Sequence, residues 1–140
     1  MMTEKFSFLK KAVFVFVFIA LSAVSASALN LDFRLVNSTG LVMYRLYLSP
    51  SEISRFDFDM DEITGGAFPL SSGRYTDIQI RNPNRQRYRH WDMRIYFRDS
   101  QYISIYNVDL SRISRFTIDS DANAYDDLGK FYTIKYNDAN

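Results

Sequence analysis

The feature that most constrains the fold of this chain is a regular alternation of apolar and polar residues. Apolar residues occupy every second position from Trp91 to Phe97, and Asp92 and Arg94 lie between them. A period of two residues is that of a β-strand, in which successive side chains point to opposite faces of the sheet. Because no segment after residue 28 keeps a period of 3.6 residues over three turns, the sequence predicts an all-β domain.

The same pattern divides the rest of the chain into short strands. Strands are expected over 31–35, 41–48, 75–80, 91–97, 101–107, 116–118 and 132–136, with a short strand or extended loop over 56–61 and a polar loop over 120–129. Segment 41–48 is apolar on both sides, which is typical of a central strand. Segments 91–97 and 101–107 predict a β-hairpin. Seven to eight strands with turns roughly every ten residues predict an antiparallel β-sandwich.

The N-terminal segment predicts export from the cytoplasm. Lys5, Lys10 and Lys11 precede an apolar run over 12–21, and small residues close the segment at 26–28. This order is typical of a secretory signal peptide. We expect cleavage after residue 28, a single domain over 29–136, a frayed tail over 137–140, and a periplasmic or extracellular location. The alternative is an uncleaved anchor, because 12–29 reaches the length that spans a bilayer, and membrane contact is expected only through this leader.

Composition narrows the classes of partner. The chain has 17 Lys and Arg against 16 Asp and Glu, and the leader takes three lysines and Glu4 with it, so the mature chain is nearly neutral. This balance argues against general polyanion binding, and no nucleic-acid partner is expected. The chain has no cysteine, so the exported domain must be stable through burial of its many aromatic side chains rather than through disulfides. No cofactor is expected, and the sequence leaves the oligomeric state open.

Four short motifs follow one another through the mature chain. They are Asn37-x-Thr39-Gly40, then Leu46-Tyr47-x-Ser49-Pro50, then Trp91-Asp92-x-Arg94 with Asp99 in the next turn, and finally Asn107-Val108-x-Leu110. In this order they resemble a group of small secreted bacterial all-β domains of unassigned function. Such domains usually carry a Trp-Gly-Asp-like loop where this chain has residues 56–59, and cysteines where it has His90 and Ser111. The resemblance implies an exported all-β domain, and it implies nothing about activity.

Aromatic and basic residues supply the first candidate binding surface. By alternation, one face opposite the apolar stripe carries Tyr88, Arg94, Tyr96, Tyr102 and Tyr106. Aromatic rings and arginines can stack on flat ligands, and export favours a glycan or another envelope component as the partner. The alternatives are that the arginines pair with acidic residues of a neighbouring strand, and that the tyrosines pack in a second layer. We therefore expect a non-enzymatic binding or structural module.

Acidic residues supply a candidate metal site at Asp57, Asp59 and Asp61. On an extended strand these carboxylates share one face at a spacing of roughly 6.5–7 Å. Calcium needs several oxygens at about 2.3–2.6 Å, so the segment would have to form a loop. The alternative is a solvated strand face that discourages edge-to-edge pairing. A calcium-stabilised surface module is thus a rival function.

Catalytic patterns are weak in this chain. His90 is the only histidine, and no nucleophile motif accompanies it. The rival from the enzyme class is a carboxylate-dependent hydrolase or lyase that uses residues such as Asp92 and Asp99. That chemistry requires two acidic groups that converge in a cleft, one of them with a raised pKa.

Overall fold

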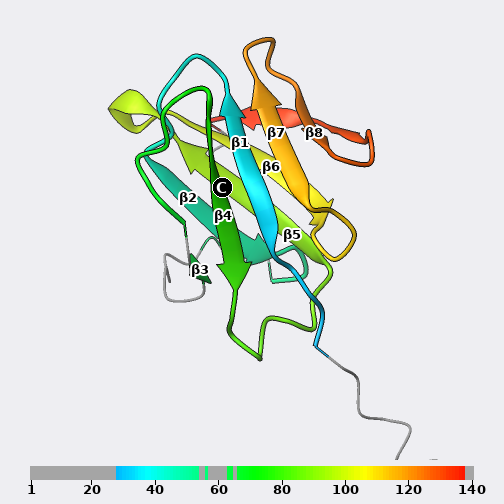
Figure 1. The fold of residues 1–140 in the computed structure, drawn as a ribbon. Coiled ribbons are helices and arrows are strands. Elements are labelled where there is room, and N and C mark those ends of the chain that lie inside the picture. Colours follow the sequence, from blue (N-terminus) through cyan, green and yellow to red (C-terminus); the bar gives the residue numbers. More distant parts are fainter. Residues whose placement is uncertain (1–27, 54–55, 57–62, 65, 138–140) are drawn as a thin grey trace, which may run out of the picture.

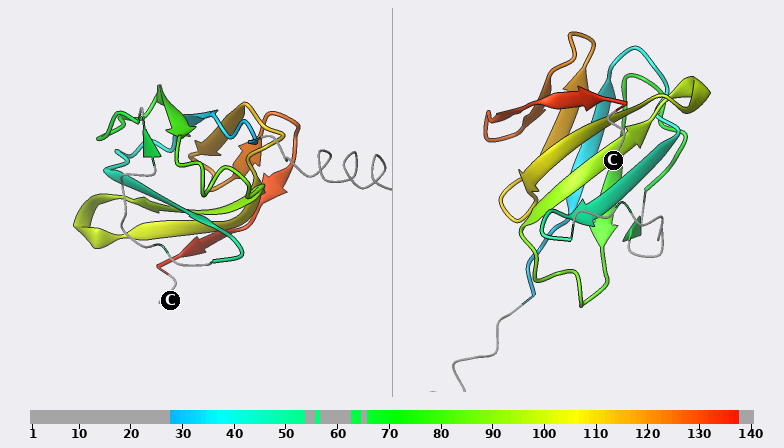
Figure 2. Two further views of the ribbon diagram at one scale, coloured as in Figure 1. Left: turned by 90° about the horizontal axis from the view of Figure 1, so that it is seen from below. Right: turned by 180° about the vertical axis from the view of Figure 1, so that it is seen from behind.

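The described residues of the computed structural model, 28–53, 56, 63–64 and 66–137, form two β-sheets packed face to face (Figure 1). The six-stranded sheet has the order β3 (Ile63–Thr64), β4 (Arg74–Ile80), β1 (Phe33–Ser38), β7 (Arg115–Asp119), β8 (Ala124–Asp126) and β9 (Phe131–Tyr132). The four-stranded sheet has the order β10 (Ile134–Tyr136), β6 (Tyr102–Asp109), β5 (His90–Tyr96) and β2 (Arg45–Pro50). The two layers are seen edge-on in Figure 2. The predicted all-β sandwich is confirmed, with ten short strands among the described residues where seven to eight were expected.

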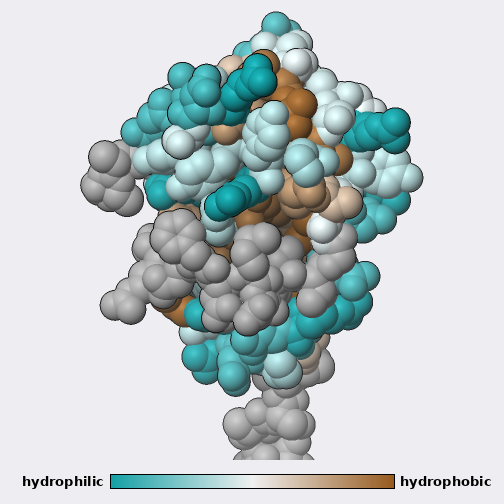
Figure 3. Space-filling model, turned by 90° about the vertical axis from the view of Figure 1, so that its left-hand side faces the viewer, coloured by the Kyte–Doolittle hydropathy of each residue, from teal (hydrophilic) through white to brown (hydrophobic). Residues whose placement is uncertain are grey.

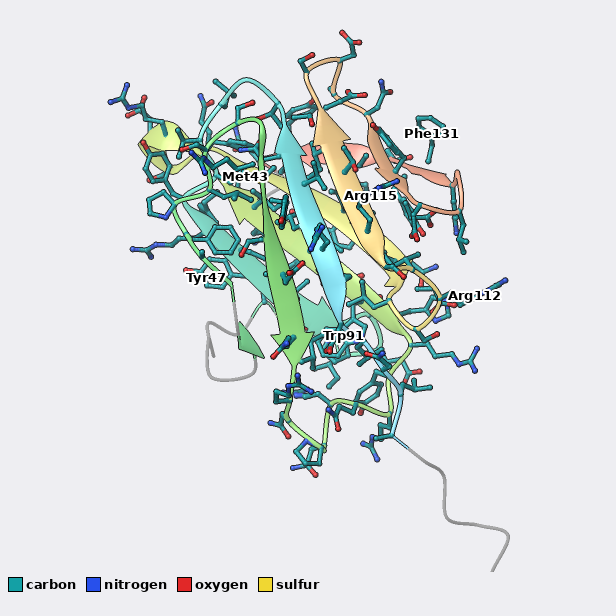
Figure 4. The ribbon with its side chains drawn as sticks, viewed as in Figure 1. Met43, Tyr47, Trp91, Arg112, Arg115 and Phe131 are labelled. Carbon is teal, nitrogen blue, oxygen red and sulfur yellow. The ribbon has the colours of Figure 1, made fainter. Side chains whose placement is uncertain are left out.

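Alternating apolar residues of both sheets form one core between the layers. Trp91, Met93 and Ile95 of β5 are at most 1% exposed, and they belong to the same buried cluster as Leu35 and Phe116 of the opposite sheet. The labelled residues Met43 and Trp91 lie at opposite ends of this core (Figure 4). Seen from the side, apolar surface shows as a narrow band between hydrophilic flanks (Figure 3). The period of two residues therefore places one face of each sheet in the core.

The predicted hairpin is confirmed in β5 and β6. Tyr96 pairs with Tyr102 and Ile95 with Ile103, so both strands keep the predicted register of apolar and polar faces. A turn of 3₁₀ type, η2 (Arg98–Ser100), joins them, and Asp99 within it has φ 60°. Aspartate tolerates this left-handed region better than most residues, because its short side chain can hydrogen-bond locally.

One strand pair departs from the predicted antiparallel arrangement. β1 lies between β4 and β7; it runs antiparallel to β4 and parallel to β7, where Leu35 pairs with Phe116. A parallel pair needs a long crossover connection. Between β1 and β7 the chain passes through strands of the other sheet, so the connection is long enough for either direction.

The predicted central strand over 41–48 is wrong in its bounds and its place. β2 begins at Arg45 and lies at the edge of the four-stranded sheet, while Met43 forms a bridge with Leu70 instead. Both faces of β2 are nevertheless covered, because Leu46 and Leu48 face the core and Tyr47 is only 7% exposed. Burial under neighbouring side chains, rather than pairing on both sides, explains its apolar character.

The predicted polar loop over 120–129 contains a strand. β8 pairs with β7 through Ala124 and Ile118, and Ala124 is fully buried. The carboxylate of the buried Asp126 accepts the backbone N–H groups of Leu128 at 2.9 Å and Lys130 at 3.0 Å. Polar side chains in this segment thus form hydrogen bonds within the turn that follows the strand. Because these polar residues lower the hydropathy of the segment, its hydropathy does not reveal the strand.

The motif residues hold irregular backbone in place. The fully buried Asn37 donates to the carbonyls of Leu41 and Leu70, both at 2.8 Å. Asp92, 2% exposed, accepts the hydroxyl of Ser51 at 2.7 Å and the backbone N–H of Asn107 at 2.9 Å. Asn107 has φ 63° and lies in a bulge between β5 and β6. These polar groups satisfy backbone donors and acceptors that the sheets leave unpaired.

The predicted leader over 1–28 and tail over 137–140 lie outside the described residues, apart from Ala28 and Asn137. In the described part of the chain we find no helix with the length and hydropathy that a bilayer crossing requires.

Candidate functional site

Four of the five predicted ligand residues lie close together on the outer face of the four-stranded sheet. Arg94 and Tyr96 come from β5, Tyr102 and Tyr106 come from β6, and the pairing of Tyr96 with Tyr102 sets them side by side. Tyr47 of β2 pairs with Arg94 and joins the same face. The alternation read from the sequence therefore places these four side chains on one surface.

These rings pack against one another. Tyr96 is in edge contact with Tyr47, with ring centres 5.4 Å apart and planes at 83°, and its centre lies 5.1 Å from that of Tyr102. Tyr47 is buried, and the other two tyrosines are half-buried. Such edge-to-face contacts are favourable. The tyrosines thus form the second packed layer that the sequence left open as an alternative.

Arg94 lies between two rings of this layer. Its guanidinium carbon is 4.3 Å from the ring centre of Phe56 and 4.5 Å from that of Tyr102. Its Nε donates to the hydroxyl of Ser104 at 3.0 Å. The ring of Phe56 also contacts Tyr106, at 6.3 Å between centres. These cation–π contacts hold the guanidinium beside the two rings, so Arg94 is part of the layer.

Tyr88 lies elsewhere. It belongs to the loop between β4 and β5, and its ring packs against the core cluster. Its hydroxyl accepts from Nη2 of Arg87 at 2.8 Å, and its backbone carbonyl accepts the indole N–H of Trp91 at 2.9 Å. Alternation fails for Tyr88 because β5 begins only at His90.

The acidic candidates divide into two groups. Asp57, Asp59 and Asp61 lie outside the described residues, and among the described ones no three His, Cys, Asp or Glu side chains are grouped to hold a metal ion. Asp92 is bonded within the bulge, and Asp99 lies in the turn after β5. Extended strand separates those two by roughly 15–20 Å, so they do not converge as an acid–base pair. His90 is exposed, with Nε2 4.0 Å from Asp109.

The outer face of the six-stranded sheet carries a second aromatic surface, and this face is turned to the viewer in Figure 1. Strand pairing sets one row of outward residues across five strands, and we call it the aromatic row: Tyr75, Val36, Thr117, Tyr125 and Phe131. Tyr75 is 56% and Phe131 66% exposed, and the rings of Tyr125 and Phe131 are 5.5 Å apart. Phe131 lies at the sheet edge, away from the core residues Met43 and Trp91 (Figure 4).

A row of charges runs beside the aromatic row, and we call it the charged row: Asp77, Arg34 and Arg115, from β4, β1 and β7. Arg34 donates to Asp77 through Nε at 2.9 Å and Nη2 at 3.3 Å, and its guanidinium carbon lies 3.8 Å from the ring centre of Tyr75. The hydrogen bond between them raises the pKa of Arg34 and lowers the pKa of Asp77. Both groups are therefore charged at neutral pH.

The charged row borders a hollow of about 490 Å³. Its lining includes Arg34, Asp77 and Arg115 together with Asp32 and Asp127. The carboxylate of Asp127 accepts the backbone N–H groups of Ser114 at 3.0 Å and Arg115 at 3.3 Å, and hydrogen bonds from these groups lower its pKa against the opposing effect of desolvation. The combination of exposed rings, a hollow with charged side chains in its lining, and opposed charges can hold a ligand that both stacks and forms hydrogen bonds.

Only part of this second surface can be predicted from sequence patterns. Alternation puts Arg34 and Tyr75 on outward faces, but it does not set their strands next to each other. β8 lies within the predicted polar loop over 120–129, and the single strand predicted over 132–136 is divided between β9 and β10. Comparisons with protein-family models, with curated proteins and with solved structures gave no match for this chain. The similarity to small secreted domains therefore stays a prediction.

Proposed function

We propose that this chain is an exported, non-enzymatic binding module of the bacterial periplasm or cell surface, which recognises a glycan of the envelope. The observation that carries the proposal is the outer face of the six-stranded sheet. There the exposed ring of Tyr75 contacts Arg34, which pairs with Asp77 and lines the hollow, and the exposed ring of Phe131 lies at the far end of the same row. Sugars present apolar ring faces together with hydroxyl groups, so they need stacking surfaces and hydrogen-bonding groups at once.

The N-terminal leader supports the proposed location outside the cytoplasm. A basic head, an apolar run and small residues before Leu29 are typical of an export signal. Fractionation of bacteria that express the full chain tests it directly. The proposal expects processed protein in the periplasmic or surface fraction, and unprocessed protein confined to the cytosol contradicts it.

A retention experiment tests the binding function. Purified protein is coupled to a resin and incubated with polysaccharide released from bacterial envelopes, and the retained carbohydrate is measured. We expect the native protein to retain carbohydrate and Tyr75→Ala to retain less. No retention by the native protein would contradict the function.

A variant of the other sheet locates the binding surface. Tyr102→Ala alters the packed layer on the four-stranded sheet, which holds four of the predicted ligand residues. The proposal expects folded Tyr102→Ala protein to retain carbohydrate as the native protein does. Lost retention in Tyr102→Ala with full retention in Tyr75→Ala would place the ligand on the four-stranded sheet instead.

A further inference from the structure

The aromatic row is long and crosses the strands. Neighbouring strands lie about 4.8 Å apart, so three steps from β4 to β8 put Tyr75 about 14 Å from Tyr125. Phe131, one strand further, extends the row to the sheet edge. Between the rings the row holds Val36 and Thr117, whose side chains are half-buried and buried. A ligand that contacts both ends must be an elongated chain that lies across the strands.

The charges beside the row are balanced in sign and placed close together. Arg34 uses two of its five N–H donors on Asp77, which leaves donors and carboxylate lone pairs next to each other. Arg115 and Asp127 also line the same hollow, and so does Asp32, whose carboxylate lies 3.7 Å from the guanidinium of Arg81. A hydroxyl group both donates and accepts, so it suits such mixed neighbours. A sulfate, phosphate or carboxylate only accepts, and it would find no net positive charge here, because an aspartate lies near each arginine.

From these two observations we infer that the ligand is a neutral, unbranched, hydroxyl-rich glycan chain that lies across β4, β1, β7 and β8. Its sugar rings contact Tyr75 at one end and Tyr125 and Phe131 at the other, and its hydroxyls bond to the Arg34–Asp77 pair. The inference rests on the proposed function and adds the charge, shape and direction of the ligand.

The test uses the purified protein and envelope polysaccharide separated by anion exchange into a neutral and an acidic fraction. The native protein is expected to retain the neutral fraction in preference to the acidic one, and added salt is expected to leave that retention unchanged, because salt screens only charge–charge attraction. Tyr75→Ala and Phe131→Ala are each expected to weaken binding about 2- to 10-fold. Thermal melting of both variants is the control that shows whether they are folded.

Leu41→Ala is the matched control, because Leu41 is 59% exposed and lies in the β1–β2 connection, outside the aromatic row. It is expected to bind as the native protein does. Preferred, salt-sensitive retention of the acidic fraction overturns the inference but leaves the proposed function standing. Binding of the neutral fraction that neither Tyr75→Ala nor Phe131→Ala weakens has the same meaning: it overturns the inference and leaves the proposed function standing. Failure to retain either fraction overturns both.

Discussion

Three buried polar side chains hold the irregular parts of this backbone. Asn37 spans the β1–β2 connection, Asp92 fixes the bulge at Asn107, and Asp126 closes the turn between β8 and β9. Each is at most 5% exposed. A buried donor left without its acceptor costs about 1–3 kcal/mol, so each of these positions should tolerate little change.

Asp92→Ala is expected to lower the free energy of unfolding by about 1–3 kcal/mol, because it leaves the Asn107 N–H and the Ser51 hydroxyl without their acceptor. Asp92→Asn keeps one oxygen that can accept and should cost less. Urea unfolding of the two variants measures the difference. Equal losses in both would mean that this oxygen does not hold the bulge.

Ionisation of the Tyr132 hydroxyl makes the free energy of unfolding depend on pH in the alkaline range. Desolvation raises the pKa of Tyr132 above its usual 10, and the hydrogen bond to Asp126, 2.8 Å long, raises it further. The folded state therefore keeps a proton that the unfolded chain loses near pH 10. This contribution is complete below about pH 10 and is lost as the pH rises from there through the raised pKa of the folded state.

Tyr132→Phe removes the titrating group and should flatten the alkaline decline. The slope of the unfolding free energy against pH, measured by urea unfolding above pH 10, is expected to be shallower than in the native protein. The ring contact with Phe116 is kept in this variant, which isolates the hydroxyl. An unchanged slope would show that Tyr132 keeps its ordinary pKa in the folded state.

Among the strands, β2 shows how an edge strand can be apolar on both sides, because the packed tyrosine layer on the four-stranded sheet covers its outer face. β2 is covered on its outer face because Tyr47 packs edge-on against Tyr96, and Tyr96 packs against Tyr102. The same contacts make the outer face of the four-stranded sheet a structural layer. Because the rings of Tyr47, Tyr96 and Tyr102 pack against one another, they expose less surface to a ligand than Tyr75 and Phe131 do.

Tyr96→Ala is expected to destabilise the protein by about 2 kcal/mol, because it removes two ring contacts and half-buried apolar area. Tyr96→Phe keeps the ring and should unfold close to the native midpoint in urea. Carbohydrate retention by folded Tyr96→Ala protein should match the native value. Native stability combined with lost retention would instead make this face the binding surface.

Taken as a whole, the molecule uses segments from both ends of the described chain, one in the core and one in a sheet. Leu31, just before β1, is 1% exposed and belongs to the core, and the backbone N–H of Leu29 donates to the carbonyl of Gln86 at 3.1 Å. β10, near the other end, pairs with β6. The first residues after the predicted cleavage point are therefore part of the sandwich.

Mass spectrometry of exported protein is expected to give a chain that begins at Leu29. A shortened chain that begins at Asp32 should be less stable by about 2–5 kcal/mol, because it loses the buried Leu31 side chain. A chain that begins at Leu31 serves as the control and keeps that side chain. Equal urea midpoints for these two shortened chains would contradict the assigned role of Leu31.

Alternation alone determined most of the strands and the residues in them that face the core. Trp91, Met93 and Ile95 were placed correctly, as was the β5–β6 hairpin, because a period of two residues and a short turn are local properties. Alternation also set Arg94, Tyr96 and Tyr102 on one face, since their strands are neighbours in sequence. It could not say whether that face would be packed or exposed.

The order of distant strands in each sheet follows from long-range pairing, which no single segment of the sequence reveals. Backbone hydrogen bonds are the same whichever strand accepts them, so the sequence of β1 does not show that it lies between β4 and β7. That order sets Tyr75 beside Val36 and Thr117 and brings Arg34 to Asp77. The aromatic and charged rows exist only through this long-range pairing, because their members are spread from residue 34 to residue 131.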